Sequence, residues 1–242
     1  MSRKSRRNAP QPAPAAEPPA PPRAKGRRGL VAGAIVVVLL AFVGGVLVFK
    51  AESDASARQS AARSRAHLAS EHAPALGQAD AKVHIVEFLD PACETCAIFF
   101  PHVKRLMAAS PERIRLSVRH IPLHKGSGEV IRILEAARAQ EKYWQALEAL
   151  LASQDRWTVN HKVYPERVWP ALEGLGLDLD RVRAEMNSPE VVQRIERDLA
   201  DARALGVSKT PEYFVNGRPL PRFGLEELQG LVREELRSAY GS

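Results

Sequence analysis

The chain has 242 residues, of which 45% are hydrophobic and 26% charged, so it is long enough for one folded domain with appended segments. Its formal net charge of +7 comes from residues 1–29, where eight lysines and arginines face a single acid, Glu17. Residues 30–242 carry 27 basic and 27 acidic groups, and this balance excludes a nucleic-acid-binding protein that relies on a basic folded surface.

Residues 1–29 also hold seven of the eighteen prolines. A segment rich in proline, alanine and basic residues cannot bury a hydrophobic core. We therefore expect a disordered, basic, cytoplasmic tail.

Residues 30–49 are twenty consecutive residues without a charge. A helix of that length spans about 30 Å, the thickness of the hydrocarbon core of a lipid bilayer. Arg27 and Arg28 precede it, so the positive-inside rule places the N-terminus in the cytoplasm. This predicts a single-pass protein of the bacterial inner (cytoplasmic) membrane, with its folded domain in the periplasm.

A cleaved signal peptide is the alternative interpretation of the same segment. Ala55-Ser56-Ala57 is a small-residue sequence of the kind found at cleavage sites. The apolar run is, however, longer than the roughly 7–15 residues of a signal-peptide core, and this favours an uncleaved anchor.

Residues 50–73 are rich in alanine, arginine and serine. Leu68 is the only large aliphatic residue among them, so they lack the apolar seam of a coiled coil. We predict a polar, helical stalk that serves as a spacer.

The folded domain is predicted for residues 74–242. Val83–Leu89 is a short apolar run rich in β-branched residues, which is typical of a buried strand, and the cysteines follow it directly. Ala97–Ala109 has helical spacing, and Ile114–Ile121 is a second predicted strand. Five further segments have helical patterns: Val130–Gln140, Tyr143–Ala152, Pro165–Leu175, Leu179–Met186 and Pro189–Leu205.

Near the C-terminus, Asn216-Gly217 is a strong signal for a two-residue hairpin turn. It predicts that Tyr213–Val215 and Arg218–Leu220 pair as antiparallel strands. Leu225–Ala239 is a final amphipathic helix. The predicted order is therefore strand, helix, strand, several helices, hairpin and helix.

Cys93 and Cys96 are the only cysteines of the chain. One CxxC pair cannot complete a four-cysteine zinc site, but it can form a redox-active disulfide. Because a strand ends just before the pair, Cys93 is expected at a helix N-terminus, where free N–H groups and the helix dipole stabilise a thiolate. Cys96 lies one turn further along the helix and should be more covered.

Two motifs about 115 residues apart give a specific resemblance. Phe88-Leu-Asp-Pro-Ala-Cys-Glu-Thr-Cys96, together with Gly206-Val-Ser-Lys-Thr-Pro211, resembles the DsbA-like family of the thioredoxin superfamily. The resemblance implies an α/β thioredoxin-like fold with a helical domain inserted at about residues 125–204. It also implies that Cys93 is the nucleophile and that Cys96 is the resolving cysteine. No bound cofactor is needed, because the disulfide is the redox group, and we expect no metal site.

Glu87 lies in the first predicted strand, between apolar neighbours on both faces. Strand alternation places it with Ile85 and Leu89, so we expect it to be buried with a raised pKa. The resemblance implies that it exchanges protons with Cys96. The alternative is an edge-strand glutamate that reaches water.

Thr210-Pro211 is the second predicted part of the site. The residues alone favour an ordinary proline at the start of a strand, because few X–Pro bonds are cis. The resemblance instead implies a cis-proline loop that faces the disulfide and binds the backbone of the substrate, with Thr210 influencing substrate preference.

Glu94 and Thr95 stand between the cysteines and are expected to tune the redox potential. A negative charge at Glu94 disfavours a thiolate at Cys93, so the protein should be less oxidising than relatives with histidine there. If Glu94 faces solvent, this effect becomes small.

The predicted function is thiol–disulfide exchange with exported proteins, in the oxidising direction, with a membrane redox partner that resets the disulfide. Three alternatives stay open. One is a reductase or isomerase supplied by a membrane electron relay. Another is a copper-binding or chaperone-like module that uses the cysteines with a histidine such as His102. The third is a tethered scaffold with an incidental disulfide.

Overall fold

The structure is a computed structural model that describes residues 25–241, so residues 1–24 of the predicted tail lie outside the described residues. The chain divides into two units, residues 1–52 and residues 53–242, which are considered separately. Helix α1 (Lys25–Leu68) contributes to both units.

The first unit contains an apolar stretch of α1. Ile35–Ser56 has a mean hydropathy of 2.3 and is, within the described residues, the one helix long and apolar enough to cross a membrane. This is compatible with the predicted single-pass anchor at residues 30–49. The helix already includes residues 25–29, which were predicted to belong to the disordered tail. The last proline of the tail is Pro22, so no later proline interrupts the helical backbone.

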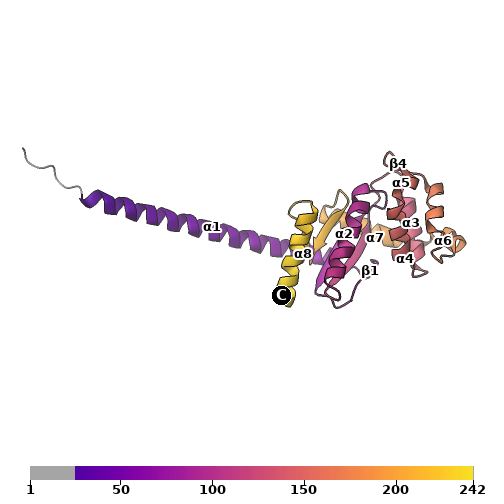
Figure 1. Ribbon diagram of the computed structural model, residues 1–242, viewed down its shortest axis with the longest axis horizontal. Coiled ribbons are helices and arrows are strands. Elements are labelled where there is room, and N and C mark those ends of the chain that lie inside the picture. Colours follow the sequence, from indigo (N-terminus) through magenta and orange to yellow (C-terminus); the bar gives the residue numbers. More distant parts are fainter. Residues whose placement is uncertain (1–24, 242) are drawn as a thin grey trace, which may run out of the picture. The chain divides into compact units, whose positions relative to one another are not determined.

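The second unit is built on a five-stranded mixed sheet (Figure 1). Its strand order is β1-β3-β2-β6-β7, with β2 in the centre. β2 and β3 are parallel, and Val83 pairs with Ile114 at one end and Leu89 with His120 at the other. All other pairs are antiparallel. The strands are β1 (Ala75–Leu76), β2 (Val83–Leu89), β3 (Ile114–His120), β6 (Glu212–Val215) and β7 (Arg218–Pro219).

Two cores cover the two faces of this sheet. On one face, Ile85 and Leu89 of β2 pack in the larger core with helices α2 (Glu94–Ala109) and α8 (Leu225–Tyr240). On the other, Val86 and Phe88 pack with the end of α1 and with α7 (Pro189–Leu205). The alternation predicted for β2 is therefore confirmed, and it places Glu87 on the face of α2.

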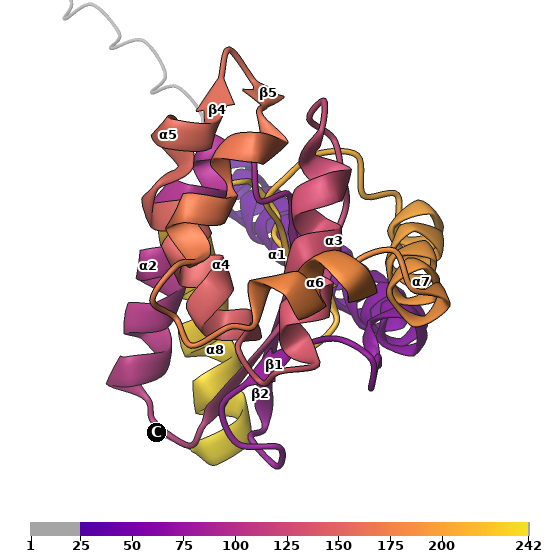
Figure 2. The same cartoon turned by 90° about the vertical axis from the view of Figure 1, so that its right-hand side faces the viewer.

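Helices inserted between β3 and β6 form the remainder of the domain (Figure 2). Trp157 is fully buried among them, and their core is continuous with the core of the sheet. This segment corresponds to the insertion predicted at about residues 125–204. Its elements before α7 are α3 (Ser127–Arg138), α4 (Tyr143–Ala152), α5 (Gln154–Trp157), β4 (Thr158–Val159), β5 (Lys162–Val163), η1 (Pro165–Arg167), η2 (Trp169–Leu172) and α6 (Leu179–Glu185).

The predicted helix Pro165–Leu175 is wrong. The segment forms two short 3₁₀ helices, η1 and η2, instead of one α-helix. Pro170 lacks the N–H that a continuous α-helix would use at that position, and its ring crowds the preceding turn. The strands β1, β4 and β5 were not predicted, because two residues are too few to give a period-two pattern.

The end of the predicted stalk, residues 50–73, is part of the folded domain. Leu68 is 4% exposed and Ala73 is 5% exposed, and Leu68 packs in the second core. Arg119 of β3 donates a hydrogen bond to the carbonyl of His67 at 3.1 Å. The domain therefore begins before residue 74, because Leu68, the one large aliphatic residue of the stalk, packs on the apolar face of the sheet formed by Val86 and Phe88.

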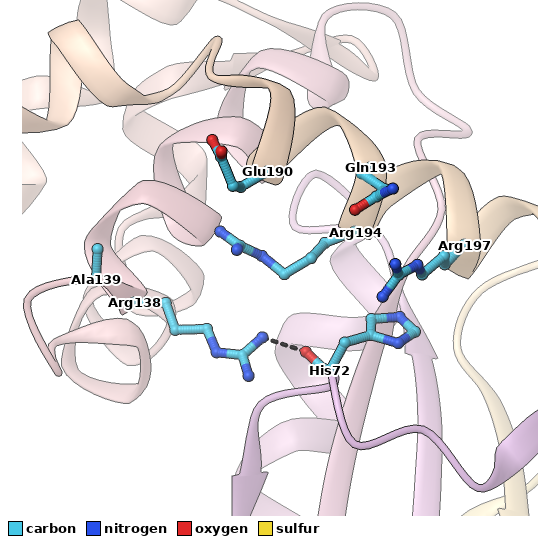
Figure 3. A pocket seen from close by; sticks show the side chains of 7 residues that line it. All are labelled: His72, Arg138, Ala139, Glu190, Gln193, Arg194 and Arg197. Atoms are coloured by element: carbon cyan, nitrogen blue, oxygen red, sulfur yellow. Dashed lines mark hydrogen bonds between the residues drawn. The ribbon is translucent and has the colours of Figure 1, made fainter.

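A polar cavity of about 460 Å³ lies where α3 and the start of α7 approach the segment before β1 (Figure 3). Arg194 of α7 donates to Glu135 of α3 at 2.6 Å. Arg138 of α3 donates to the carbonyl of His72. The bond from Arg138 ties residue 72 to the inserted helices. Arg138 and Arg194, which line the cavity, are therefore hydrogen-bonded within the fold.

Candidate active site

The two cysteines lie at the start of α2. Strand β2 ends at Leu89, a short turn follows, and Cys93 is the N-cap of the helix. Cys93 is 5% exposed and Cys96 is fully buried, and both are free thiols in this structure. The predicted position of Cys93 at the helix N-terminus is confirmed.

The pKa of Cys93 is lowered to about 6. The largest cause is a hydrogen bond with the Cys96 side chain, and a side-chain hydrogen bond with Thr210 and the backbone N–H groups of Cys96 and Thr95 add to it. Burial acts in the opposite direction and is outweighed. Cys93 is thus largely a thiolate at neutral pH, which is the form that attacks disulfides.

Cys96 has the opposite character. Burial raises its pKa strongly, and the hydrogen bond to Cys93 and the negative charges of Glu87 and Cys93 raise it further. The pair therefore combines a reactive thiolate with a neutral thiol, in the order expected for a nucleophile and a resolving cysteine.

Glu87 is fully buried, as predicted, and lies on the face of the sheet that α2 covers. Burial raises its pKa to about 8, which outweighs the hydrogen bond that the Tyr213 hydroxyl donates to Oε1 at 3.0 Å. Its Oε2 has no hydrogen-bond partner within the described residues. At neutral pH the group is a neutral acid close enough to Cys96 to act on its pKa, so it is chemically suited to give or take a proton there.

The peptide bond between Thr210 and Pro211 is cis, as the resemblance implied. The Cys93 thiol donates a hydrogen bond to the Thr210 carbonyl at 3.3 Å. The fold therefore brings the loop before β6 against the sulfur of Cys93, 117 positions away in the sequence.

Glu94 is half exposed and pairs with His161 at 3.2 Å. The groups that lower the pKa of Cys93 are Cys96, Thr210 and the helix backbone. Glu94 is not among them. The structure thus agrees with the interpretation in which Glu94 faces solvent. Thr95 contributes through its backbone N–H.

Asp90 is a residue that the sequence reasoning missed. It is fully buried and follows β2 directly. Its carboxylate accepts bonds from the backbone N–H groups of Ala92, Leu123 and His124 and from the Ser127 hydroxyl, over 2.6–3.0 Å. Asp90 therefore joins the turn before the cysteines to the loop after β3. An acid directly after a predicted buried strand was the available signal.

Gln154 is the second missed residue, and it comes from the inserted helices. Its buried amide donates to the carbonyls of Pro91 at 2.7 Å and Cys93 at 3.1 Å. Nothing in the local sequence distinguishes it, because the contact exists only once α5 packs on the active-site turn.

Among the described residues, the cysteines belong to no cluster with metal-ligand spacing. His102, considered in the copper-binding alternative, is instead paired with Arg105 at 2.8 Å. The arrangement is thus a thiolate, a buried thiol, a buried neutral acid and a proline loop, and it suits thiol–disulfide exchange.

Comparison with known proteins points in the same direction. The profile of a family described as Thioredoxin matches residues 69–234. A "thioredoxin-like oxidoreductase" from Silicibacter pomeroyi superposes with a TM-score of 0.62 and 29% identity, over 72% of this chain and 98% of that one. The "thiol-disulfide exchange protein alpha-DsbA2" from Wolbachia pipientis has a TM-score of 0.63 and 22% identity, over 76% and 97% respectively.

A curated relative carries a different name. The "Na(+)/H(+) antiporter NhaA" of Herminiimonas arsenicoxydans is 36% identical over 144 residues, which is 60% of this chain and 22% of the antiporter. This chain thus spans about a fifth of the length of that relative. The similarity concerns a part of the antiporter and gives no ground to assign ion transport to this protein.

Proposed function

Because the chain belongs to the thioredoxin family and has a DsbA-like architecture, we propose that it is a protein disulfide oxidoreductase that works through Cys93 and Cys96. The observation that carries the proposal is the contrast in acidity within the pair. The pKa of Cys93 falls to about 6 and that of Cys96 is strongly raised. Cys93 is therefore the reactive sulfur, and Cys96 stays protonated in the reduced protein.

In the oxidising direction, a substrate thiolate attacks Cys93 and breaks the Cys93–Cys96 disulfide. Cys96 leaves and receives a proton from Glu87. A second substrate thiolate attacks the substrate sulfur of the mixed disulfide and releases the Cys93 thiolate. The substrate thereby loses two electrons and gains a disulfide, while the protein becomes a dithiol that a membrane redox partner reoxidises.

The Thr210-Pro211 loop supports the binding step of this proposal. The Thr210 carbonyl accepts a hydrogen bond from the Cys93 thiol, which supports a role of this loop in holding the substrate backbone beside the sulfur. Tyr213, two residues after Pro211, contacts Glu87, so the loop and the proton donor are joined. We assign substrate binding to Thr210 and Pro211.

The direction of electron flow follows from how strongly the reduced form is stabilised. Thiolates of pKa about 3.5 and about 7 accompany potentials of about −120 mV in DsbA and about −270 mV in thioredoxin. A Cys93 pKa of about 6 lies between these two values, so we expect the potential to lie between about −120 mV and about −270 mV. The protein should therefore be more oxidising than thioredoxin, which supports the oxidising direction that we propose, with a reductase or isomerase as the alternative.

The deciding test is the redox equilibrium of the full chain, in detergent, with glutathione buffers. A midpoint at or above about −200 mV supports the oxidase, and one near −270 mV supports a reductase. A Cys93→Ser variant serves as the control that must not exchange. If the wild-type protein exchanges no disulfide with glutathione or a reduced test protein, the proposed activity is wrong.

We further propose that the domain acts on exported proteins in the periplasm, anchored through the N-terminal apolar helix. The basic residues before that helix support this orientation. Protease added to intact spheroplasts should then digest residues 53–242 without lysis of the cells. Protection of this segment until lysis would reverse the proposed orientation.

A further inference from the structure

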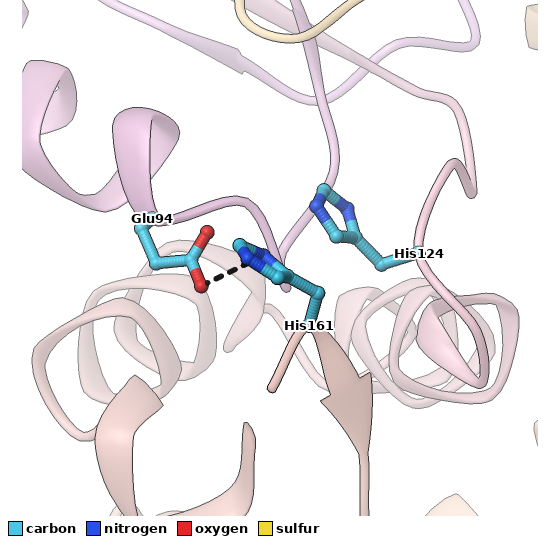
Figure 4. A group of neighbouring side chains, drawn as sticks. All are labelled: Glu94, His124 and His161. Carbon is cyan, nitrogen blue, oxygen red and sulfur yellow. Dashed lines mark ion pairs between the residues drawn. The ribbon is translucent and has the colours of Figure 1, made fainter. Parts of the chain in front are cut away.

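Glu94, His124 and His161 come together beside the start of α2 (Figure 4). Each offers one ligand atom, and these atoms lie within 4.8 Å of one another. The three residues stand far apart in the sequence, on α2, on the loop between β3 and α3, and on the β4–β5 hairpin. Their spacing in the sequence has no metal-binding pattern, so the cluster is a product of the fold.

The hairpin that carries His161 is held in place by backbone structure. Asn160 and His161 both have positive φ, 51° and 60°, which suits a tight two-residue turn that follows the twist of the strands. The N–H of Val163 donates to the carbonyl of Lys125 at 3.0 Å, next to His124. This bond joins the hairpin to the loop that carries His124, and the ring centroids of the two histidines are 6.0 Å apart.

His124 is oriented by a buried partner. Its Nδ1 pairs with the Asp90 carboxylate at 2.9 Å, and Asp90 is itself fully buried and held by backbone N–H groups. This leaves Nε2 of His124 available as a ligand. A carboxylate that holds the distal nitrogen of a histidine is a recurrent arrangement around metal-binding imidazoles.

We propose that Glu94, His124 and His161 form a binding site for a zinc ion. Two imidazoles and one carboxylate are ligands that Zn²⁺ accepts in a three-residue site, with a fourth position open to water. Tetrahedral ligands about 2.0–2.1 Å from zinc are about 3.3 Å apart. His161 Nδ1 and Glu94 Oε1 are already 3.2 Å apart. Both side chains are more than half exposed, so an ion reaches them from solvent. The site does not use Cys93 or Cys96.

The test is a calorimetric zinc titration of the full chain in detergent, without a histidine tag and with the cysteines oxidised so that thiolates cannot bind. We expect one zinc per chain. His161→Ala should weaken the affinity by at least about tenfold, because loss of a ligand costs no less than loss of an outer partner. Glu94→Gln should weaken it as well, since it keeps the shape of the side chain and removes its charge.

His102→Ala is the matched control, because His102 is on the same helix but outside the cluster. It should bind zinc like the wild-type protein. His161 is at an exposed hairpin tip, and circular dichroism should show an unchanged fold in its variant. The proposal fails if the oxidised wild-type chain binds no zinc, or if His161→Ala and Glu94→Gln both bind it as tightly as His102→Ala does.

Discussion

Cys93 and Cys96 are three positions apart and lie in different electrostatic surroundings. The helix N-terminus and two side-chain hydrogen bonds favour negative charge on Cys93, whereas burial and two nearby negative groups disfavour it on Cys96. Positions one turn apart can differ this much because burial dominates at Cys96, whereas at Cys93 the hydrogen bond with the Cys96 side chain outweighs burial.

The first prediction concerns the reactivity of Cys93. In the reduced protein its alkylation by iodoacetamide should rise with a midpoint near pH 6, where the thiolate forms. Cys96→Ala should move this midpoint upward, because the Cys96 side chain is the largest contribution to the lowered pKa. An unchanged midpoint in that variant would assign the low pKa to Thr210 and the helix backbone instead.

The second prediction concerns Glu87. Its folded pKa is about 8 in the reduced protein, above its ordinary value of 4.5, and the largest cause is burial, which oxidation of the cysteines does not remove. Above pH 4.5 the folded state therefore holds a proton that the unfolded state releases, until the raised folded pKa is reached. The free energy of unfolding of the oxidised protein should therefore fall as pH rises through this window, by about 1.4 kcal/mol per pH unit from this group.

Glu87→Gln removes that titration and should flatten the slope, as urea unfolding at several pH values would measure. The oxidised form is used because its cysteines do not titrate. Glu148→Gln, at an exposed glutamate on α4, is the matched control for the loss of one carboxylate. Equal slopes in the wild-type and Glu87→Gln proteins would mean that Glu87 is ionised in the fold.

At the scale of elements, the turn before the cysteines is held by groups from outside its own strand and helix. Asp90 connects it to the loop after β3, and Gln154 connects it to α5. The sequence predicted β2, α2 and their order, because apolar periodicity and the CxxC motif are local signals. It did not predict these two contacts, because the hydrogen-bond partners of a polar residue depend on which distant elements pack against it.

The third prediction tests the close packing of the loop between β3 and α3 on the β4–β5 hairpin. Gly126 has a φ of +89°, and an added Cβ would lie 3.1 Å from the Cβ of Val163. Gly126→Ala should therefore lower the free energy of unfolding by about 1–2 kcal/mol, because a left-handed backbone disfavours alanine.

Gly230→Ala is the matched change on α8. Nothing lies within 4 Å of its added Cβ, and alanine favours a helix interior over glycine by about 1 kcal/mol. Urea midpoints of the two variants should thus move in opposite directions. A Gly126→Ala protein as stable as Gly230→Ala would show that the loop relaxes away from the hairpin.

At the scale of the whole molecule, the start of the folded domain differs between the sequence prediction and the structure. Composition distinguishes an apolar run from a polar stalk, and it predicted the domain from residue 74. It could not show that the stalk ends inside the fold, because a single leucine gives no periodic pattern. In the structure Leu68 covers the second face of the sheet, and residues 67–72 bond to β3, α3 and α7.

The fourth prediction compares two truncated chains, one from residue 53 and one from residue 74. The shorter chain lacks Leu68, which is 4% exposed, and the 2.9 Å pair between His72 and Asp198. It also lacks the carbonyl of His67 that accepts from the buried Arg119. Removal of a buried leucine alone typically costs about 2–5 kcal/mol, so the chain from residue 74 should be less stable by at least about 3 kcal/mol.

Leu68→Ala in the longer chain separates the apolar contribution from the polar ones and should cost about 2–4 kcal/mol. Urea unfolding followed by tryptophan fluorescence, to which the buried Trp157 contributes, measures all three proteins in the same way. If both truncated chains unfold at the same urea concentration, residues 53–73 are a spacer after all. If the shorter chain is destabilised as expected, residues 53–73 belong to the core that supports β2, and through β2 the cysteines.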